Sequence, residues 1–171
     1  MASRPCRVLF VCTGNSARSI LAECLLNRLG GGRFVAASAG SHPKGAVHPQ
    51  ATALLTELGY ETAGLSSKSW AVFTGPGVPL LDLVITLCDA AAGESCPIWP
   101  GTPVTAHWGI PDPAATEAAG TPAAFHRAYR QLEGRVRRLA ALDPDALGAA
   151  EFAARVRAIA RTDEETVDAD H

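Results

Sequence analysis

Short apolar segments alternate with amphipathic segments along the first 140 residues of the chain. Four short segments are mostly apolar, a pattern typical of strands buried in a parallel sheet: residues 7–11, 34–38, 80–87 and 104–106. Apolar residues at helical spacing predict helices over about 17–29, 49–58 and 122–139. Strands that alternate with helices predict an α/β domain, a three-layer sandwich with a four-stranded, mostly parallel sheet and right-handed crossovers.

The C-terminal part of the chain has a different pattern. After Asp143-Pro144 a further helix is predicted, which we expect to pack on the domain or to make an oligomer contact through Leu147, Phe152, Val156 and Ile159. The last ten residues contain five acidic residues and no Lys or Arg, which favours disorder. We therefore divide the chain into a main domain (1–143), a helical extension (144–161) and an acidic tail (162–171).

Composition places the chain among single-domain proteins outside the membrane. With 171 residues, 47% of them hydrophobic, one sizeable core is expected. The apolar segments are shorter than the roughly 18–20 residues that span a bilayer, and the N-terminus lacks a signal-peptide pattern, so we expect a cytoplasmic protein. The net charge is −2, and the arginines between residues 127 and 161 are interpreted as solvated helix faces, because no aromatic residues alternate with them for base stacking. We expect a monomer that binds neither nucleic acid nor membranes.

The strongest chemical signal is Cys12 followed, after five intervening residues, by Arg18, between the first strand and the first helix. A loop of this length can curl around a tetrahedral oxyanion, with backbone N–H groups and the helix N-terminus directed at the anion. The Arg18 guanidinium can donate two parallel hydrogen bonds to that anion. The same donors stabilise a thiolate, so we expect Cys12 to be a nucleophile at neutral pH. The alternative, a buried cysteine before an ordinary strand-to-helix turn, is disfavoured by Gly14 and Arg18 at these positions.

The residues of this loop have individual expected roles. Gly14 permits a turn with positive φ, and Asn15 can brace the loop or itself adopt the left-handed conformation. The hydroxyl of Ser19 can hydrogen-bond the thiolate. The expected oxyanion contacts are Thr13, Gly14, Asn15, Ser16, Ala17, Arg18 and Ser19.

Four motifs lie along the chain in the order found in one protein family: Val11–Ser19, Ser38-Ala39-Gly40, Thr86-Leu87-Cys88 with Cys96-Pro97, and His107–Pro113. At these residues the chain resembles the low-molecular-weight protein tyrosine phosphatases, and more narrowly their arsenate reductase branch, over residues 5 to 142. The resemblance implies that residues 1–143 form a phosphatase-like arsenate reductase domain. Its implied function is reduction of arsenate to arsenite for arsenic detoxification, with phosphate or sulfate as competing oxyanions.

A catalytic acid is expected at Asp112, in a loop stiffened by Pro111 and Pro113. An Asp-Pro pair is usually only a turn. The resemblance implies a general acid here, which would protonate the oxygen that leaves opposite the nucleophile. His107 and Trp108 are interpreted as supports of this loop rather than as groups that titrate in the reaction.

Cys88 and Cys96 distinguish a reductase from a phosphatase. A phosphatase needs no further thiol, whereas reduction of As(V) to As(III) requires two electrons. The resemblance implies that Cys88 attacks the Cys12–arsenic adduct and leaves a Cys12–Cys88 disulfide, which Cys96 carries to an external thiol reductant. The segment between Cys88 and Cys96 is commonly one residue shorter in thioredoxin-coupled relatives, so the reductant can be thioredoxin, glutaredoxin or a small thiol that bypasses Cys96. The alternative is that both are small hydrophobic residues beside a strand, which is how Cys6 and Cys24 are interpreted.

No bound cofactor or metal is expected, because the histidines lack the convergent spacing of a metal site. By resemblance, Asn15, Glu23 and Ser38 match positions that hold a monovalent cation in some relatives. Lys68 stands at the later acidic position, so its ammonium either replaces that cation or is an exposed loop lysine.

Two other functions are considered. A low-molecular-weight phosphatase that hydrolyses phosphomonoesters is the main alternative, although Ala114-Ala115 stand where paired tyrosines would form an aromatic wall. The third is an oxyanion-binding sensor or adaptor, and it leaves the joint presence of Cys12, Cys88 and Asp112 unexplained.

Overall fold

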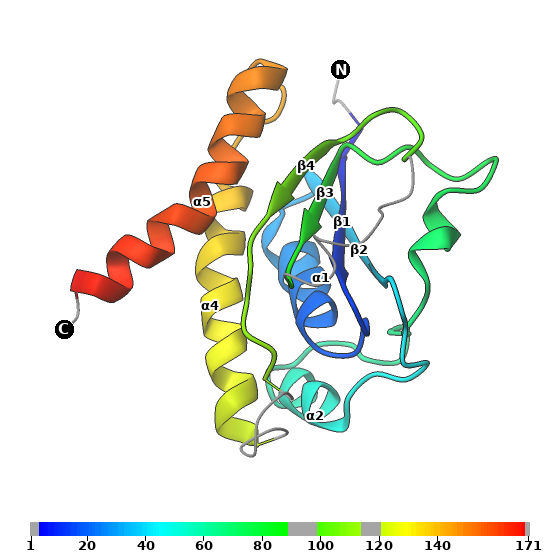
Figure 1. The fold of residues 1–171 in the computed structure, drawn as a ribbon, viewed down its shortest axis with the longest axis vertical. Helices are drawn as coiled ribbons and strands as arrows, with labels where there is room; N and C mark the ends of the chain where they lie inside the picture. Colours follow the sequence, from blue (N-terminus) through cyan, green and yellow to red (C-terminus); the bar gives the residue numbers. More distant parts are fainter. Residues whose placement is uncertain (1–3, 89–98, 114–120, 170–171) are drawn as a thin grey trace.

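A single sheet of four strands forms the centre of the fold. The computed structural model describes residues 4–88, 99–113 and 121–169, with side chains described as far as residue 161. The strands are β1 (Cys6–Cys12), β2 (Phe34–Gly40), β3 (Leu83–Thr86) and β4 (Val104–His107), in the spatial order β2-β1-β3-β4 (Figure 1). All three strand pairs are parallel. The predicted α/β class with a four-stranded sheet is confirmed, and this sheet is parallel throughout.

The helices are arranged around this sheet (Figure 1). Helices α1 (Arg18–Leu29) and α4 (Pro122–Ala140) pack against each other beside the sheet, and the shorter α2 (Pro49–Glu57) lies near the N-terminal end of α4. Helix α5 (Ala149–Ala169) contacts α4 and the edge strand β4, and the 3₁₀ turn η1 (Trp70–Phe73) contacts β2. The predicted helices are therefore present, and α5 covers the β4 edge of the sheet.

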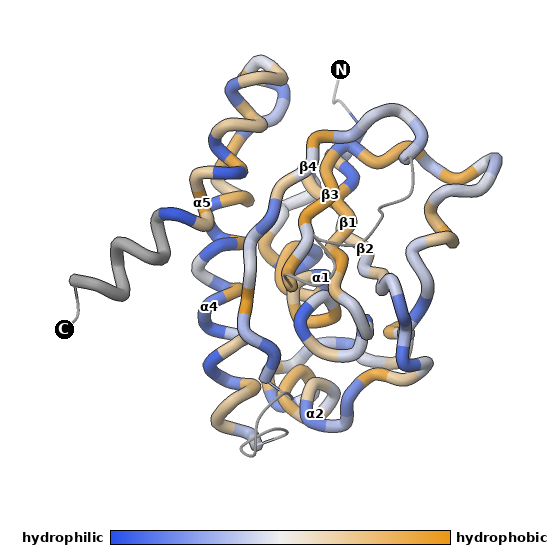
Figure 2. The backbone as a smooth tube through the Cα atoms, in the orientation of Figure 1, coloured by the Kyte–Doolittle hydropathy of each residue, from blue (hydrophilic) through white to orange (hydrophobic). Residues whose placement is uncertain are grey.

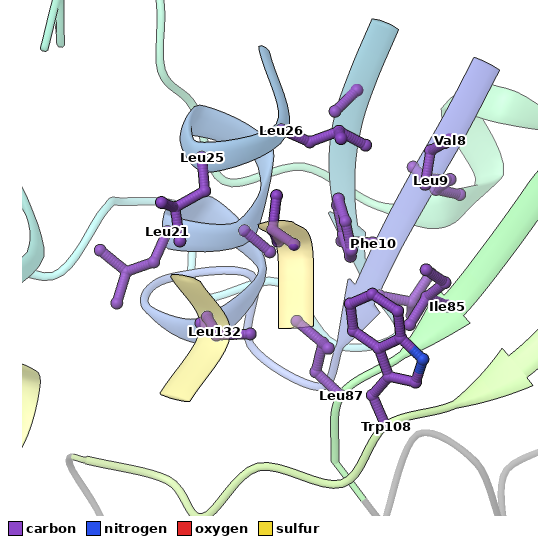
Figure 3. Close-up of a cluster of buried hydrophobic side chains, with 14 of the residues drawn as sticks. Val8, Leu9, Phe10, Leu21, Leu25, Leu26, Ile85, Leu87, Trp108 and Leu132 are labelled. Atoms are coloured by element: carbon purple, nitrogen blue, oxygen red, sulfur yellow. The ribbon is translucent and has the colours of Figure 1, made fainter. Parts of the chain in front are cut away.

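The centre of the core lies between strand β1 and helices α1 and α4. Residues 8–12 of β1 are each no more than 2% exposed, as expected for an apolar strand in the middle of a parallel sheet. Figure 3 shows Leu21 and Leu25 of α1 and Leu132 of α4 in the same cluster as Phe10 of β1. Along the chain, apolar residues concentrate in β1, β3 and α1, while polar and apolar residues alternate along α4 (Figure 2). This alternation is the amphipathic pattern that predicts α4 from the sequence.

Strand β3 is shorter than the apolar segment 80–87 predicts. Leu80 is 51% exposed, and the strand begins only at Leu83, directly after Asp82. Its carboxylate accepts two hydrogen bonds from the Arg4 guanidinium (2.7 and 2.8 Å) and one from the backbone N–H of Arg7 (2.8 Å). Burial alone would raise the pKa of Asp82, but these bonds outweigh it and lower the pKa below its ordinary value. Asp82 is thus held by its side chain and by backbone hydrogen bonds to the Arg7 carbonyl and from the Val104 N–H, just before the strand begins at Leu83.

Helix α5 extends further than the sequence predicts. It is helical as far as Ala169, whereas the acidic segment 162–171 is predicted to be disordered. Extending a helix that has already formed costs much less than starting one, which accounts for helix in a segment with few apolar residues. No helix in the described part of the chain combines the length and the apolar character that a membrane span requires.

Candidate active site

The loop after β1 is held in place by backbone hydrogen bonds from segment 42–48. The carbonyls of Thr13, Gly14 and Ser16 accept hydrogen bonds of 2.9 to 3.0 Å from backbone N–H groups in segment 42–48. In a planar trans peptide the carbonyl and the following N–H point in opposite directions. Each bonded carbonyl therefore turns the next N–H of the loop away from segment 42–48. Backbone N–H groups ordered in this way can serve as donors to an oxyanion.

Asn15 connects the loop to the nucleophile. Its side-chain oxygen accepts a hydrogen bond from the backbone N–H of Lys68 (2.9 Å), and its amide donates one to the Ser19 hydroxyl (2.7 Å). Ser19 Oγ lies 2.9 Å from Cys12 Sγ. Because the Ser19 oxygen already accepts from Asn15, its own proton can be donated to a thiolate at Cys12. The left-handed residue of the loop is Asn15, with φ of 44°, which confirms the expectation that Asn15 can adopt this conformation; Gly14 does not use the positive φ that it permits.

Gly40 at the end of β2 is required by close packing. A Cβ at this position would lie 2.6 Å from the carbonyl oxygen of Thr13 and 3.0 Å from the backbone nitrogen of Asn15. The oxyanion loop therefore rests directly on the backbone of β2. The sequence gives the signal as the motif Ser38-Ala39-Gly40, but the reason for the glycine is visible only in three dimensions.

Arg18 bridges the oxyanion loop and the loop that carries Asp112. One guanidinium nitrogen donates to the carbonyl of Ile110 (3.0 Å), and another lies 3.6 Å from the Asp112 carboxylate. The Arg18 side chain is only 12% exposed, whereas Asp112 is 32% exposed. The predicted acid and the predicted anion-binding residue are thus neighbours, although they are 94 positions apart in the chain.

Cys88 follows β3 and lies beside the oxyanion loop. Its sulfur is 3.2 Å from the hydroxyl oxygen of Thr13, and its side chain is buried. The preceding residue, Leu87, donates its backbone N–H to the carbonyl of Val11, which holds this end of β3 against the end of β1. Cys96 and the pair Ala114-Ala115 lie outside the described residues.

One cavity of about 430 Å³ brings these residues together. Its lining includes Cys12, Thr13, Gly14, Ser16, Ala17, Arg18, His42, Lys44, Cys88 and Asp112. His42 and Lys44 were missed in the sequence, because they lie in a Pro- and Gly-rich loop without a chemical motif. Lys44 and Arg18 place two cationic side chains against one carboxylate, so the cavity suits an anion.

A second polar cluster is formed by Glu23, Ser38 and Lys68, and it contacts the oxyanion loop through Asn15. The Lys68 ammonium donates to the carbonyls of Ser38 (3.1 Å) and Ser66 (2.8 Å). Burial raises the pKa of Glu23, while the nearby Lys68 charge and a hydrogen bond from the Ser38 backbone act in the opposite direction. The Ser38 hydroxyl is buried and has no hydrogen-bond partner among the described residues. Lys68 is therefore part of a packed cluster rather than an exposed loop lysine.

The structure also shows the surroundings of four other residues discussed in the sequence analysis: Cys6, Cys24, His107 and Arg135. Burial raises the pKa of both the Cys6 and the Cys24 thiol to about 12, which agrees with small hydrophobic residues. His107 Nδ1 lies 2.8 Å from the Thr86 hydroxyl. Arg135 was expected on a solvated helix face, and this is wrong: it is 4% exposed and donates to the carbonyl of Trp108. A helix-surface pattern cannot reveal that an arginine turns inward to a carbonyl of another loop.

Comparison with known proteins identifies the family of this chain. Residues 7–152 match the family of low molecular weight phosphotyrosine protein phosphatases. An arsenate reductase of Halalkalibacterium halodurans is 33% identical over 135 residues, which cover 78% of this chain and 94% of the relative. A solved arsenate reductase in its phosphate-binding state has a TM-score of 0.65 and 31% identity, covering 80% of this chain and 97% of its own.

A third similar protein carries a more specific description. It is a thioredoxin-dependent arsenate reductase of Corynebacterium glutamicum, with a TM-score of 0.59 and 27% identity, covering 81% of this chain and 62% of its own. The family match spans most of the chain and contains every described residue of the cavity. The chain belongs to the low-molecular-weight phosphotyrosine protein phosphatase family.

Proposed function

We propose that this protein reduces arsenate to arsenite through a cysteine–arsenate adduct and a thiol/disulfide relay, in arsenic detoxification. The observation that carries the proposal is the second thiol in the oxyanion cavity, Cys88, at 3.2 Å from the Thr13 hydroxyl. Hydrolysis of a phosphate ester has no use for that thiol, whereas a two-electron reduction does. Relatives named arsenate reductase, at about 33% identity, support the same conclusion.

The first step is nucleophilic displacement at arsenic. Arsenate binds to the backbone N–H groups of residues 13–19 and to the Arg18 guanidinium, which holds two of its oxygens. The Cys12 thiolate attacks arsenic and forms a sulfur–arsenic bond. Protonated Asp112 donates its proton to the departing oxygen, which leaves as water. Arsenic remains As(V) in this adduct.

The second step transfers the electrons. The Cys88 thiolate attacks the sulfur of Cys12, so that a disulfide forms as the sulfur–arsenic bond breaks. The electron pair of that bond stays on arsenic, which leaves as arsenite, As(III), and the two cysteines are oxidised together. Cys96 then attacks Cys88 and presents the disulfide to an external thiol reductant.

The partners follow from this cycle. Thioredoxin is the first reductant to test, because one relative is thioredoxin-dependent, and glutaredoxin or a small thiol are the alternatives. Phosphate and sulfate should compete with arsenate for the loop, in line with the phosphate-binding state of a relative. The cycle needs a compartment that keeps thiols reduced, so we place it in the cytoplasm, and we expect the protein to act as a monomer without a bound cofactor or metal.

Lys68 has a supporting role in this proposal. Its ammonium binds the Ser38 carbonyl and lies near Glu23, and its backbone N–H holds Asn15. These are the positions at which some relatives hold a monovalent cation. We propose that the ammonium supplies that positive charge from the chain itself.

Hydrolysis of phosphomonoesters is the second candidate function. It requires only Cys12, Arg18 and Asp112, and all three line the same cavity. We expect it as a slow side activity, because the same loop that binds arsenate accepts the phosphate group of an aryl ester.

The substitution Cys88→Ser separates the two functions. It should abolish steady-state arsenite release with thioredoxin, glutaredoxin or a small thiol, each supplied separately, and preserve hydrolysis of p-nitrophenyl phosphate. Cys24→Ala, in the buried face of α1, is the matched control and should keep both activities. Arsenate reduction by Cys88→Ser at the rate of the unmodified protein would mean that this thiol is structural, and the reductase proposal would fail.

A further inference from the structure

Most of helix α5 lies beyond the family domain. The family match ends at residue 152, whereas α5 runs from Ala149 to Ala169. The first half of the helix packs on the domain, with Phe152, Val156 and Ile159 each less than 9% exposed. A helix that lies mostly outside the matched family region is therefore packed against the fold.

The contact point of α5 is the beginning of the loop that carries Asp112. The indole N–H of Trp108 donates to the carbonyl of Val156 in the middle of α5 (3.0 Å), and both residues are fully buried. The Arg157 side chain donates to the carbonyl of Thr105 in β4 (3.0 Å). The extension thus binds both the strand and the first residue after it.

Helix α4 holds the same residue from another direction. The Arg135 guanidinium donates to the carbonyl of Trp108 and lies 3.4 Å from the carbonyl of Gly109. The Trp108 ring also packs beside the ring of Phe10 in β1 (Figure 3), with the ring centroids 6.1 Å apart. Trp108 is therefore fixed at its ring, its indole nitrogen and its carbonyl.

The fixed residue lies four positions before Asp112. The intervening loop contains Pro111 and donates the Ile110 N–H to the Leu87 carbonyl (2.7 Å), so it has little freedom to absorb a shift of Trp108. A cavity of about 560 Å³ is lined by Arg18 and Asp112, which also line the oxyanion cavity, and by Ala160 of α5. Helix α5 thus reaches a cavity that the Asp112 loop borders.

We infer that α5 is a positioning element for the acid, acting through the Trp108–Val156 hydrogen bond to set where the Asp112 carboxyl meets the leaving oxygen. The inference rests on the proposed role of Asp112 as general acid. Misplacing an acid slows bond cleavage in proportion to how much the leaving group needs a proton. A helix that only stabilised the fold would affect all substrates alike.

The test compares two aryl phosphates, phenyl phosphate with a poor leaving group and 2,4-dinitrophenyl phosphate with a good one. Trp108→Phe removes the indole N–H and keeps an aromatic ring. We expect kcat for phenyl phosphate to fall about tenfold, a partial loss of the roughly 10²- to 10⁴-fold that general acids contribute, with KM and the rate on the dinitrophenyl ester unchanged. Arg157→Ala, at an exposed position, loosens α5 without altering the loop. It should lower kcat for phenyl phosphate about two- to threefold and leave the rate on the dinitrophenyl ester unchanged. Trp70→Phe in η1 is the matched control and should change neither rate.

The outcomes separate this inference from the proposed function. Asp112→Asn is measured alongside and should show a larger loss confined to phenyl phosphate. If Asp112→Asn slows both esters equally, the acid role itself is wrong. If Asp112→Asn shows the selective loss while Trp108→Phe and Arg157→Ala behave like Trp70→Phe, or slow both esters alike, the positioning role of α5 is refuted and the proposed function stands.

Discussion

Gly40→Ala tests whether the packing of the oxyanion loop on β2 controls activity. The added methyl group would lie 2.6 Å from the Thr13 carbonyl oxygen, where ordinary contact begins at about 3.4 Å, so the two must separate by roughly 0.8 Å. The backbone nitrogen and the Cβ of Asn15 would also lie 3.0 Å away, and neither is the far end of a flexible side chain that could absorb the change. The loop that carries the oxyanion donors must therefore move.

The size of the effect follows from that displacement. A shift of about 1 Å in a catalytic group costs on the order of 10²-fold in rate, which corresponds to about 2.7 kcal/mol of transition-state stabilisation. Overpacking should also lower the free energy of unfolding by about 1–3 kcal/mol. We expect kcat/KM to fall about 10²-fold for both arsenate and p-nitrophenyl phosphate, because both substrates use the loop.

The assay measures arsenite release and aryl phosphate hydrolysis in parallel, with urea unfolding to establish the folded fraction. Gly64→Ala is the matched control, since a Cβ there meets no atom within 4 Å. A Gly40→Ala protein that is folded and has the same kcat/KM as Gly64→Ala would refute the packing argument.

Three further substitutions test other parts of the account. Cys12→Ser should abolish both activities and leave the unfolding curve unchanged, because serine keeps the shape but does not ionise in this loop; measurable turnover would contradict the mechanism. Arg18→Lys should lose most of the activity at constant charge, because the two parallel hydrogen bonds are lost, and phosphate binding measured by calorimetry should weaken with it. Asp82→Asn should lower the free energy of unfolding by about 1 kcal/mol at neutral pH, discounted for the exposure of Arg4. Since the pKa of Asp82 is lowered in the folded protein, that difference should be complete above about pH 4 and vanish as the pH falls through the folded pKa, and a difference that persists at lower pH would exclude this ion pair as its cause.

Much of the fold is predictable from the sequence because its signals are local. The apolar run of β1 and the spacing of Phe125, Leu132 and Leu139 in α4 depend only on which residues are buried, and the structure confirms both. The predicted strand begins three residues before β3 does, because Leu80 is apolar and yet 51% exposed. Residue type predicts burial on average and does not show which single apolar residue is exposed.

The reactive groups of the candidate site are predictable from the sequence, but the residues from other segments that surround them and hold them in place are not. A cysteine, an arginine and a spacing of five residues define the loop, and the structure brings Cys12, Arg18 and Cys88 to one cavity. The contributions of Lys44 and Arg135 come from segments far away in the chain and have no motif. Within the loop, the expected bracing role of Asn15 is confirmed, but its partner Lys68 N–H lies 53 positions away and could not be identified from the sequence.

The most direct test of the central claim is one turnover of the Cys96→Ser protein with arsenate and no reductant. Arsenite is quantified, and the disulfide is identified by mass spectrometry of non-reduced peptides. The account predicts one arsenite per chain and a peptide pair joined through Cys12 and Cys88, because the relay stops at that disulfide. Absence of arsenite, or arsenite release with both thiols still free, would contradict it.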